Sequence, residues 1–306
     1  MAKYIIKRIL VAFPVLIAVS LILFILLNVV PGDPVTVMMR EHIKPELIEV
    51  FRERMGLNDP ILVQFGRYVL NALRGDFGMS YKLQRDVSAM IREAFPHTIK
   101  LAIYAALVAW LIGIPAGILS AVKQNTLVDR AFMSFSLMGV SLPVFWAGLL
   151  MQYLFAFKLG WLPVTGYYSL RYYVLPAIVL GWQSAGTIAR LTRSNLLEVM
   201  KNDYIRTARA KGLGETVVVV GHALKNAMLP VVTMMAMQVA GLLGGAVMTE
   251  SIFGIPGLGR ITVDAMGTRD MPLLQGSVLF ITAIIIIGNM VADLLYAFLD
   301  PRIRVE

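Results

Sequence analysis

The side chains that could perform chemistry in this chain are few and stand far apart. Cysteine is absent, and the three histidines (His42, His97 and His222) belong to no His-Glu-x-x-His pattern. A thiol nucleophile and disulfides are therefore excluded, and we expect neither a metal site nor catalytic residues. The sequence also lacks a Gly-x-x-x-x-Gly-Lys-Ser/Thr loop, the pattern that cradles nucleotide phosphates.

The remaining polar candidates lie within or at the ends of long apolar segments. They are Asn28, Gln152, Gln183, Gln238, Glu250, Asn289 and Asp293. Polar groups in such segments face the interior of a helix bundle or a water-filled path. We predict a translocation path lined by Gln183, Gln238, Glu250 and Asn289, with hydrogen bonding between helices as the commoner alternative. An intramembrane enzyme would need a paired set, but the two acids fall on opposite sides of the membrane in the topology below.

Six apolar segments without Asp, Glu, Lys or Arg determine the fold class. They are Ile9–Val30, Leu101–Val122, Ala131–Phe157, Tyr172–Ala189, Ala227–Thr249 and Met271–Ala292. A helix needs roughly 20 apolar residues to cross a bilayer, and a charge at mid-membrane is costly. The composition agrees, because 58% of the residues are hydrophobic and only 15% are charged. We therefore predict an all-α polytopic membrane protein with six transmembrane helices.

The distribution of basic residues predicts the orientation. Both ends of the chain and the loops after the second and fourth segments carry fourteen Lys and Arg residues, whereas the short loops on the other side carry four. Basic residues are enriched in cytoplasmic loops, so both termini are expected in the cytoplasm. The net charge of +9 is then mainly a topology signal. Nucleic-acid binding is not expected, because no basic soluble face with interleaved aromatic residues is present.

We divide the chain into three parts. Residues 1–30 form the N-terminal tail and first span, 31–97 an external helical insert, and 98–306 a five-span core. Within the insert we predict a turn at 31–34, helices over Pro45–Met55, about Pro60–Leu73 and about Asp86–Phe95, and a turn at 75–78. The insert is interpreted either as a cap on the spans or as an entry vestibule or docking surface for an external partner.

The loop at about 193–226 is the most informative soluble segment. Asn202 and Asp203 offer an N-cap, and the residues from Tyr204 to Lys211 are expected to be helical. Gly212 is expected to end this helix, since glycine adopts the left-handed conformation easily. A second helical stretch, Glu215–Asn226, leads into the fifth segment. On physical grounds the short helix is either a contact surface for another protein or an amphipathic helix on lipid headgroups.

A family resemblance becomes close at this loop. Asp203-Tyr-Ile-Arg-Thr-Ala-Arg-Ala-Lys-Gly-Leu213, followed by His222-Ala-Leu-Lys-Asn-Ala-Met-Leu-Pro230, resembles the EAA loop of binding-protein-dependent ABC importer permeases. The match is narrower to the peptide/nickel group, in particular to the first permease of dipeptide, oligopeptide and glutathione importers. Further matching motifs are Pro31-Gly32-Asp33-Pro34, Gly56-Leu57, Gly75-Asp76-Phe77-Gly78, Leu175-Pro176, Pro256-Gly257-Leu258-Gly259-Arg260 and Asp300-Pro301-Arg302. The general Glu-Ala-Ala is replaced here by Arg206-Thr207-Ala208.

The resemblance implies the type I permease fold of ABC importers and a transport subunit without ATPase activity of its own. It implies a bacterial or archaeal cytoplasmic membrane location, a second homologous permease, two ABC ATPase subunits that bind ATP and Mg²⁺, and an external solute-binding protein. This chain would bind no cofactor. The implied solutes are dipeptides or oligopeptides, with nickel or a nickel chelate as the alternative. The implied ATPase contacts are Tyr204, Arg206, Thr207, Ala208, Arg209, Ala210, Lys211, Gly212 and Leu213.

A glycine- and proline-rich stretch follows the fifth segment. Ser251–Gly259 is flanked by Glu250 and Arg260. Its composition predicts a tight turn or re-entrant loop at the external mouth of the pore. We hypothesise an external gate formed by Gly254, Pro256, Gly257, Gly259 and Arg260.

Overall fold

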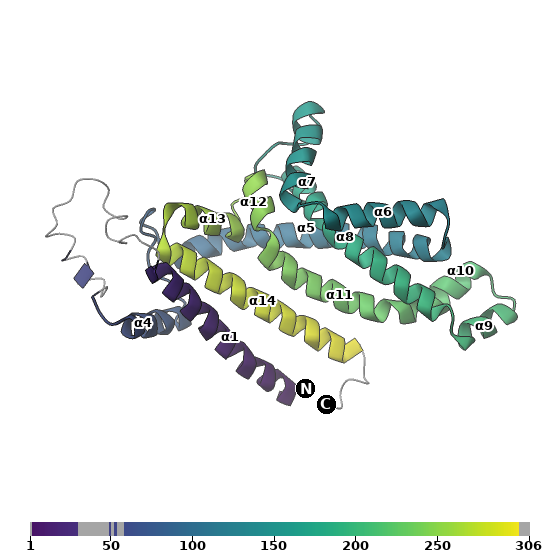
Figure 1. Cartoon of the computed structure of the whole chain (residues 1–306), viewed down its shortest axis with the longest axis horizontal. Coiled ribbons are helices and arrows are strands. Elements are labelled where there is room, and N and C mark those ends of the chain that lie inside the picture. The colour runs from purple at the N-terminus through teal and green to yellow at the C-terminus, as the bar shows by residue number, and fades with distance from the viewer. Residues whose placement is uncertain (1, 30–48, 50–51, 54–57, 300–306) are drawn as a thin grey trace. The chain divides into compact units, whose positions relative to one another are not determined.

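The structure is a computed structural model that describes residues 2–29, 49, 52–53 and 58–299 (Figure 1). The described residues are mainly helical, with one isolated antiparallel bridge between Met79 and Asp86. The turn predicted at 31–34 lies outside the described residues, as does most of the helix predicted over Pro45–Met55. The chain forms two compact units, one comprising the residues up to Thr98 with Pro256–Ile286, the other Ile99–Ile255 with the residues from Ile287 onward.

The first unit contains α1 (Ala2–Val29), α4 (Ile61–Leu73) and α13 (Leu258–Thr268), together with the first parts of α5 (Val87–Val122) and α14 (Met271–Leu299). Its core is formed by Val87, Met90, Ile91, Ala94, Leu258, Ala265 and Leu273. The helix predicted over Pro60–Leu73 is confirmed as α4. The helix predicted over Asp86–Phe95 is instead the start of α5, which continues without a break into the second predicted span.

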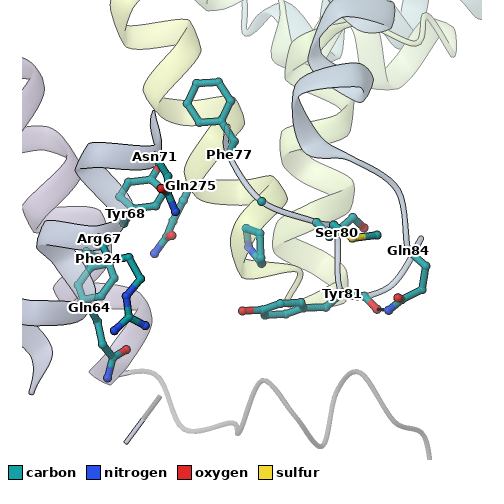
Figure 2. A pocket seen from close by; sticks show the side chains of 13 residues that line it. Phe24, Gln64, Arg67, Tyr68, Asn71, Phe77, Ser80, Tyr81, Gln84 and Gln275 are labelled. Atoms are coloured by element: carbon teal, nitrogen blue, oxygen red, sulfur yellow. Dashed lines mark hydrogen bonds between the residues drawn. The ribbon is translucent and has the colours of Figure 1, made fainter. Parts of the chain in front are cut away.

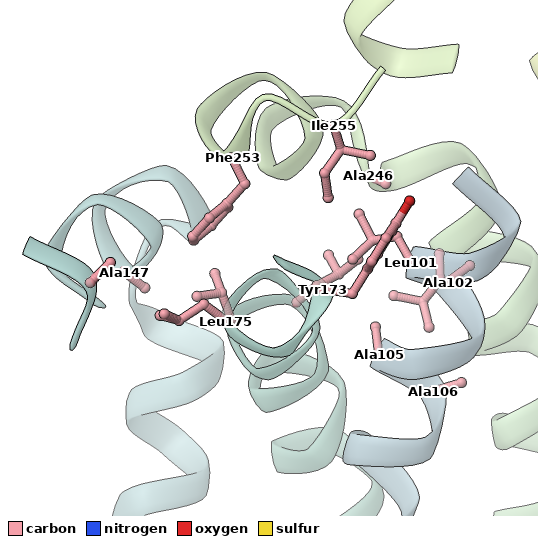
Figure 3. Packing of buried hydrophobic residues seen from close by; sticks show 14 residues of the cluster. Leu101, Ala102, Ala105, Ala106, Ala147, Tyr173, Leu175, Ala246, Phe253 and Ile255 are labelled. Atoms are coloured by element: carbon pink, nitrogen blue, oxygen red, sulfur yellow. The ribbon is translucent and has the colours of Figure 1, made fainter. Parts of the chain in front are cut away.

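The second unit contains α6 (Leu127–Ser141), α7 (Val144–Met151), α8 (Arg171–Val199), α9 (Asp203–Ala210), α10 (Glu215–Val217), α11 (Leu224–Gly245) and α12 (Val247–Phe253). Two π-helical segments, η1 (Gln152–Lys158) and η2 (Val218–Ala223), continue α7 and precede α11. Helix α8 packs against α6, α7 and α11. A core that includes Leu101, Tyr173, Leu175, Phe253 and Ile255 lies at the N-terminal end of α8 (Figure 3).

Small residues bring α5 and α8 together. Alanine or glycine occupies positions spaced four residues apart on both helices. On α5 these are Ala105, Ala109, Gly113, Gly117 and Ala121. On α8 they are Ala177, Gly181, Ala185 and Ala189. A Cβ atom added to Gly117 would lie 2.5 Å from the carbonyl oxygen of Ala189. Glycine at this position therefore allows the two backbones to touch, as small residues do between membrane helices.

The predicted spans agree with the structure only in part. Within the part of the chain that the structure describes, three helices are long and apolar enough to cross a membrane: Val87–Val122, Glu215–Gly244 and Met271–Leu294. The third predicted span, Ala131–Phe157, is wrong as one continuous helix, because Leu127–Ser141 and Val144–Lys158 meet at 107°. The break falls at Leu142, which takes an extended conformation before Pro143, as proline imposes on the preceding residue. The count of six spans stays a prediction.

Candidate functional site

Helix α9 begins and ends as its sequence predicts. Asn202 is the N-cap with an extended backbone, although its side chain makes no capping hydrogen bond, in contrast to our expectation. Gly212 follows the last turn with φ +80°, and its N–H donates to the carbonyl oxygen of Arg209 at 2.9 Å. A left-handed residue here is favourable for glycine and strained for most other residues. The helix is therefore short and sharply bounded.

Two apolar side chains anchor α9 to its own chain. Ile205 is fully buried and Ala208 is 7% exposed. Both pack into a cluster with residues of α8, η2 and α11, including Leu196, Val218 and Ala223. Ala208 was predicted to contact another subunit, but this burial leaves its side chain facing the chain's own core. Its position three residues after Ile205 places it on the same helix face.

The other predicted contact residues lie on the exposed side of the α9 loop. They are Tyr204, Arg206, Thr207, Arg209, Ala210, Lys211, Gly212 and Leu213. The Nδ2 atom of Asn226 donates to the Tyr204 hydroxyl at 2.9 Å, which fixes that ring against the second part of the loop. We refer to these eight residues as the α9 surface. It combines positive charge with a phenol and small side chains on a helix whose opposite face is anchored.

A bidentate ion pair holds the turn after α9. Nε and Nη2 of Arg209 donate to the two carboxylate oxygens of Glu215 at 3.0 and 2.6 Å. The hydrogen bonds from Arg209 hold the pKa of the Glu215 carboxyl below its usual range, and the carboxylate raises the pKa of the guanidinium. The pair closes the loop that contains Gly212 and Gly214. The α9 surface is thus fixed at both its helix and its turn.

A second ion pair ties α6 to α8 close to this loop. Nε and Nη2 of Arg193 donate to Asp129 at 2.8 and 2.7 Å, and the Asp129 side chain is almost fully buried. The Asn125 N–H also donates to this carboxylate at 2.9 Å. The Arg193 hydrogen bond is the main reason why the pKa of Asp129 lies far below its usual range. Sequence reasoning missed this pair, because the orientation argument counted basic residues and ignored acids.

The predicted path residues occupy different environments. Gln183 on α8 and Gln238 on α11 are half-buried, Glu250 on α12 is fully buried, and Asn289 on α14 is exposed. The Nε2 of Gln238 donates to the carbonyl oxygen of Ser184, next to Gln183, at 3.1 Å. This contact favours the alternative of hydrogen bonding between helices for Gln238. The path assignment of these residues stays a prediction.

The predicted gate residues are divided between the two units. In the second unit, Gly254 ends α12 with φ +68°, and the Gly166 N–H donates to the neighbouring Phe253 carbonyl at 3.0 Å. In the first unit, Gly257 caps α13 and Arg260 lies 3.8 Å from Asp264. The first unit also includes Pro256 and Gly259. A tight turn at Gly254 is confirmed, whereas the gating role is untested.

A pocket of about 520 Å³, lined by both polar and apolar side chains, lies in the first unit (Figure 2). Gln64, Arg67, Tyr68 and Asn71 reach it from α4, and Gln275 from α14. A loop that includes Ser80 and Tyr81 completes the wall; it is tied to Asp270, whose carboxylate accepts hydrogen bonds from the Ser80 hydroxyl and from the N–H groups of Tyr81 and Lys82. Among the described residues, no group of three or more His, Cys, Asp or Glu could hold a metal ion.

Comparison with known proteins defines the class. The family described as "Binding-protein-dependent transport system inner membrane component" matches residues 113–305, and the family of the N-terminal part of such components matches residues 1–102. The chain belongs to this family and is a permease subunit of an ABC importer. It is accordingly a multi-pass protein of the inner membrane.

Individual relatives match over the whole length. The chain is 40% identical to the dipeptide transport system permease protein DppB of Alkalihalophilus pseudofirmus, covering 99% of this chain and 100% of the relative. It is 42% identical to the glutathione transport system permease protein GsiC of Escherichia coli K12, covering 99% of each.

Solved structures support the fold. The inward-facing MetNI methionine ABC transporter matches with a TM-score of 0.60 at 17% identity, covering 69% of this chain and 96% of that chain. An amino acid ABC transporter with histidines matches with a TM-score of 0.55 at 14% identity, covering 71% and 95%. The all-helical type I permease fold of ABC importers is therefore the fold of this chain.

Proposed function

We propose that this chain is a permease subunit of an ATP-driven importer of dipeptides or oligopeptides. Full-length identity of 40–42% to a dipeptide permease and a glutathione permease carries this proposal. Dipeptides and glutathione are both short peptides. The chain would provide half of the translocation path, and a second homologous permease would provide the rest.

We propose that the α9 surface contacts an ABC ATPase subunit. The support is geometric: the α9 surface exposes Tyr204, Arg206 and Lys211, while Ile205 and Ala208 hold α9 to its own chain. Because its anchors pack against residues of both α8 and η2, a force on α9 would be passed to two helices together. A flexible loop would absorb that force instead.

The remaining assignments follow from the family and the predicted orientation. We place two ATPase subunits, with their ATP and Mg²⁺, on the cytoplasmic side, and an external solute-binding protein on the other. Both termini and the α9 loop would then face the cytoplasm. The basic residues of the α9 loop support this orientation under the positive-inside tendency.

Uptake of a labelled dipeptide tests the proposal. Cells lacking the gene and cells with the gene restored would be compared, with unlabelled peptides, glutathione and nickel as competitors. We expect uptake that depends on the gene and is suppressed by unlabelled peptides. Gene-independent dipeptide uptake together with gene-dependent nickel accumulation would overturn the substrate assignment and leave the permease class intact.

A further inference from the structure

Helix α7 and η1 form the second half of the broken third segment, and their outer side is apolar and exposed. The fourteen residues 144–157 contain no charged side chain. Seven large apolar or aromatic side chains of α7 and η1 are exposed: Phe145, Trp146, Leu149, Leu150, Tyr153, Leu154 and Phe157. The face opposite them, with Ala147 and Ala156, is buried against the rest of the second unit. This segment therefore needs an apolar environment on its open side.

The level of the bend places it inside the membrane. Helix α6 runs antiparallel along α8, since Asp129 pairs with Arg193 at one end and Gly139 lies against Trp182 at the other. Its 15 residues span about 22 Å, less than the roughly 30 Å hydrocarbon core. Trp182 lies about 16 Å along α8 from the first residue, Arg171. The chain thus turns through 107° before it reaches the end of α8.

Internal contacts hold the segment at this level. The Nε2 atom of Gln152 donates to the carbonyl oxygens of Val164 and Ile252 at 2.8 and 3.3 Å. Gly148 lies against Ile252 and Phe253 of α12. The one amide in the segment is therefore directed toward the protein, and no charged group points outward from residues 144–157.

We propose that α7 and η1 together form a helix that lies in the membrane plane within one leaflet, with its exposed face covered by lipid acyl chains. A helix on the membrane surface normally carries a charged face toward water, whereas residues 144–157 carry no charge. Residues typical of the headgroup level stand at its end, because Lys158 is the last residue of η1 and Trp161 and Tyr168 are exposed in the loop that returns to α8. The leaflet would be the outer one if the proposed orientation is correct.

The in-plane helix supports the turn at Gly254. Helix α12 and its terminal Phe253 pack on Gly148, and Phe253 is bonded through its carbonyl to Gly166 of the loop after η1. A segment held in lipid on one side thus provides a fixed surface for part of the predicted gate region. This inference goes beyond transport function and does not depend on which solute is carried.

Spin labels can measure the depth of this segment, because the chain has no native cysteine. The variants Leu149→Cys, Tyr153→Cys and Phe157→Cys would be labelled one at a time before assembly with the partner subunits. Collision with oxygen and with a water-soluble nickel chelate then reports membrane depth. The matched controls are Ile103→Cys, Leu107→Cys and Leu111→Cys, which have the same spacing on exposed positions of α5.

The depths separate the possible arrangements. We expect the three α5 labels to differ by about 12 Å from first to last, as in a spanning helix, and the three α7–η1 labels to share one depth in the lipid. A gradient on α7–η1 equal to that on α5 would overturn the proposal, because the segment would then continue the span. Labels reached by neither reagent would also overturn it and indicate that another protein covers the face. Labels reached only by the water-soluble chelate would place the face in water.

Discussion

Two groups of glycines in the second unit serve opposite purposes. Gly113, Gly117 and Gly181 lie where a Cβ atom would come within 2.7 Å of a backbone oxygen of the facing helix. In contrast, Gly212, Gly221 and Gly241 have no heavy atom within 4 Å of such a position. The first group permits contact within the chain, whereas the second leaves backbone open to the outside. The same residue type therefore marks either a completed helix contact or a surface open to lipid or another chain.

The largest effect is expected from filling the contact between α5 and α8. Gly117→Ala should lower stability by about 2–3 kcal/mol, because the methyl group meets the Ala189 backbone and forces the helices apart. Gly241→Ala is the control and should leave stability unchanged or raise it slightly, since alanine favours helix. Thermal unfolding of both variants in detergent measures the difference. Equal stability would contradict the close approach of α5 and α8.

A substitution of Gly212, the glycine of the α9 surface, tests the proposed contact with an ABC ATPase subunit. Gly212→Asp should reduce peptide uptake at least about tenfold, because a carboxylate at the contact must be desolvated when the ATPase subunit binds. The left-handed backbone should cost the variant only about 1 kcal/mol of stability, since aspartate tolerates it better than most residues. Gly212→Asn is the control, since asparagine also tolerates the left-handed backbone and adds no charge. Uptake and substrate-stimulated ATP hydrolysis in the reconstituted complex are the measurements. Unchanged hydrolysis with Gly212→Asp would count against the proposed ATPase contact.

A smaller effect on stability should distinguish the largely buried Asp129–Arg193 pair from the partly exposed Arg209–Glu215 pair. Asp129→Asn should cost about 1–2 kcal/mol of stability, because it leaves Arg193, whose side chain is 25% exposed, without its charge partner. Glu215→Gln should cost less than about 1 kcal/mol, since both members of that pair are partly exposed. Thermal unfolding of both variants would give the ranking. The reverse order would show that the α6–α8 pair is not a structural tie.

The smallest effect concerns pH. The folded pKa of Asp129 is lowered, so its stabilisation is present above the unfolded value of about 4 and is lost as the pH falls below it. The unfolding temperature of the wild type should therefore change little between about pH 5 and 7 from this group, and fall under more acidic conditions. Asp129→Asn should have a shallower acid dependence. Parallel curves for the two proteins would assign the acid sensitivity to other carboxylates.

Local signals were sufficient to predict α4 and α9. The boundaries of α9 depend on Asn202 and Gly212, whose backbone preferences act over a few residues. The third span was mispredicted because its apolar length outweighed Pro143, the one residue in the run that signalled the break. The burial of Ala208 follows from its position three residues after Ile205, but the sequence does not show which face of this short helix meets the rest of the chain. The Asp129–Arg193 pair depends on two helices meeting, which no local pattern specifies.

The tie between Asp270 and the loop at Ser80 has a consequence for the order in which the protein is made. The partners are 190 residues apart in sequence, and synthesis proceeds from the N-terminus at roughly 5–20 residues per second. The loop beside the pocket in the first unit can therefore be fixed only after most of the chain has left the ribosome. Until then the Ser80 hydroxyl and the N–H groups of Tyr81 and Lys82 lack the carboxylate that accepts their hydrogen bonds in the folded chain. A nascent chain truncated before Asp270 would lack all three of these hydrogen bonds.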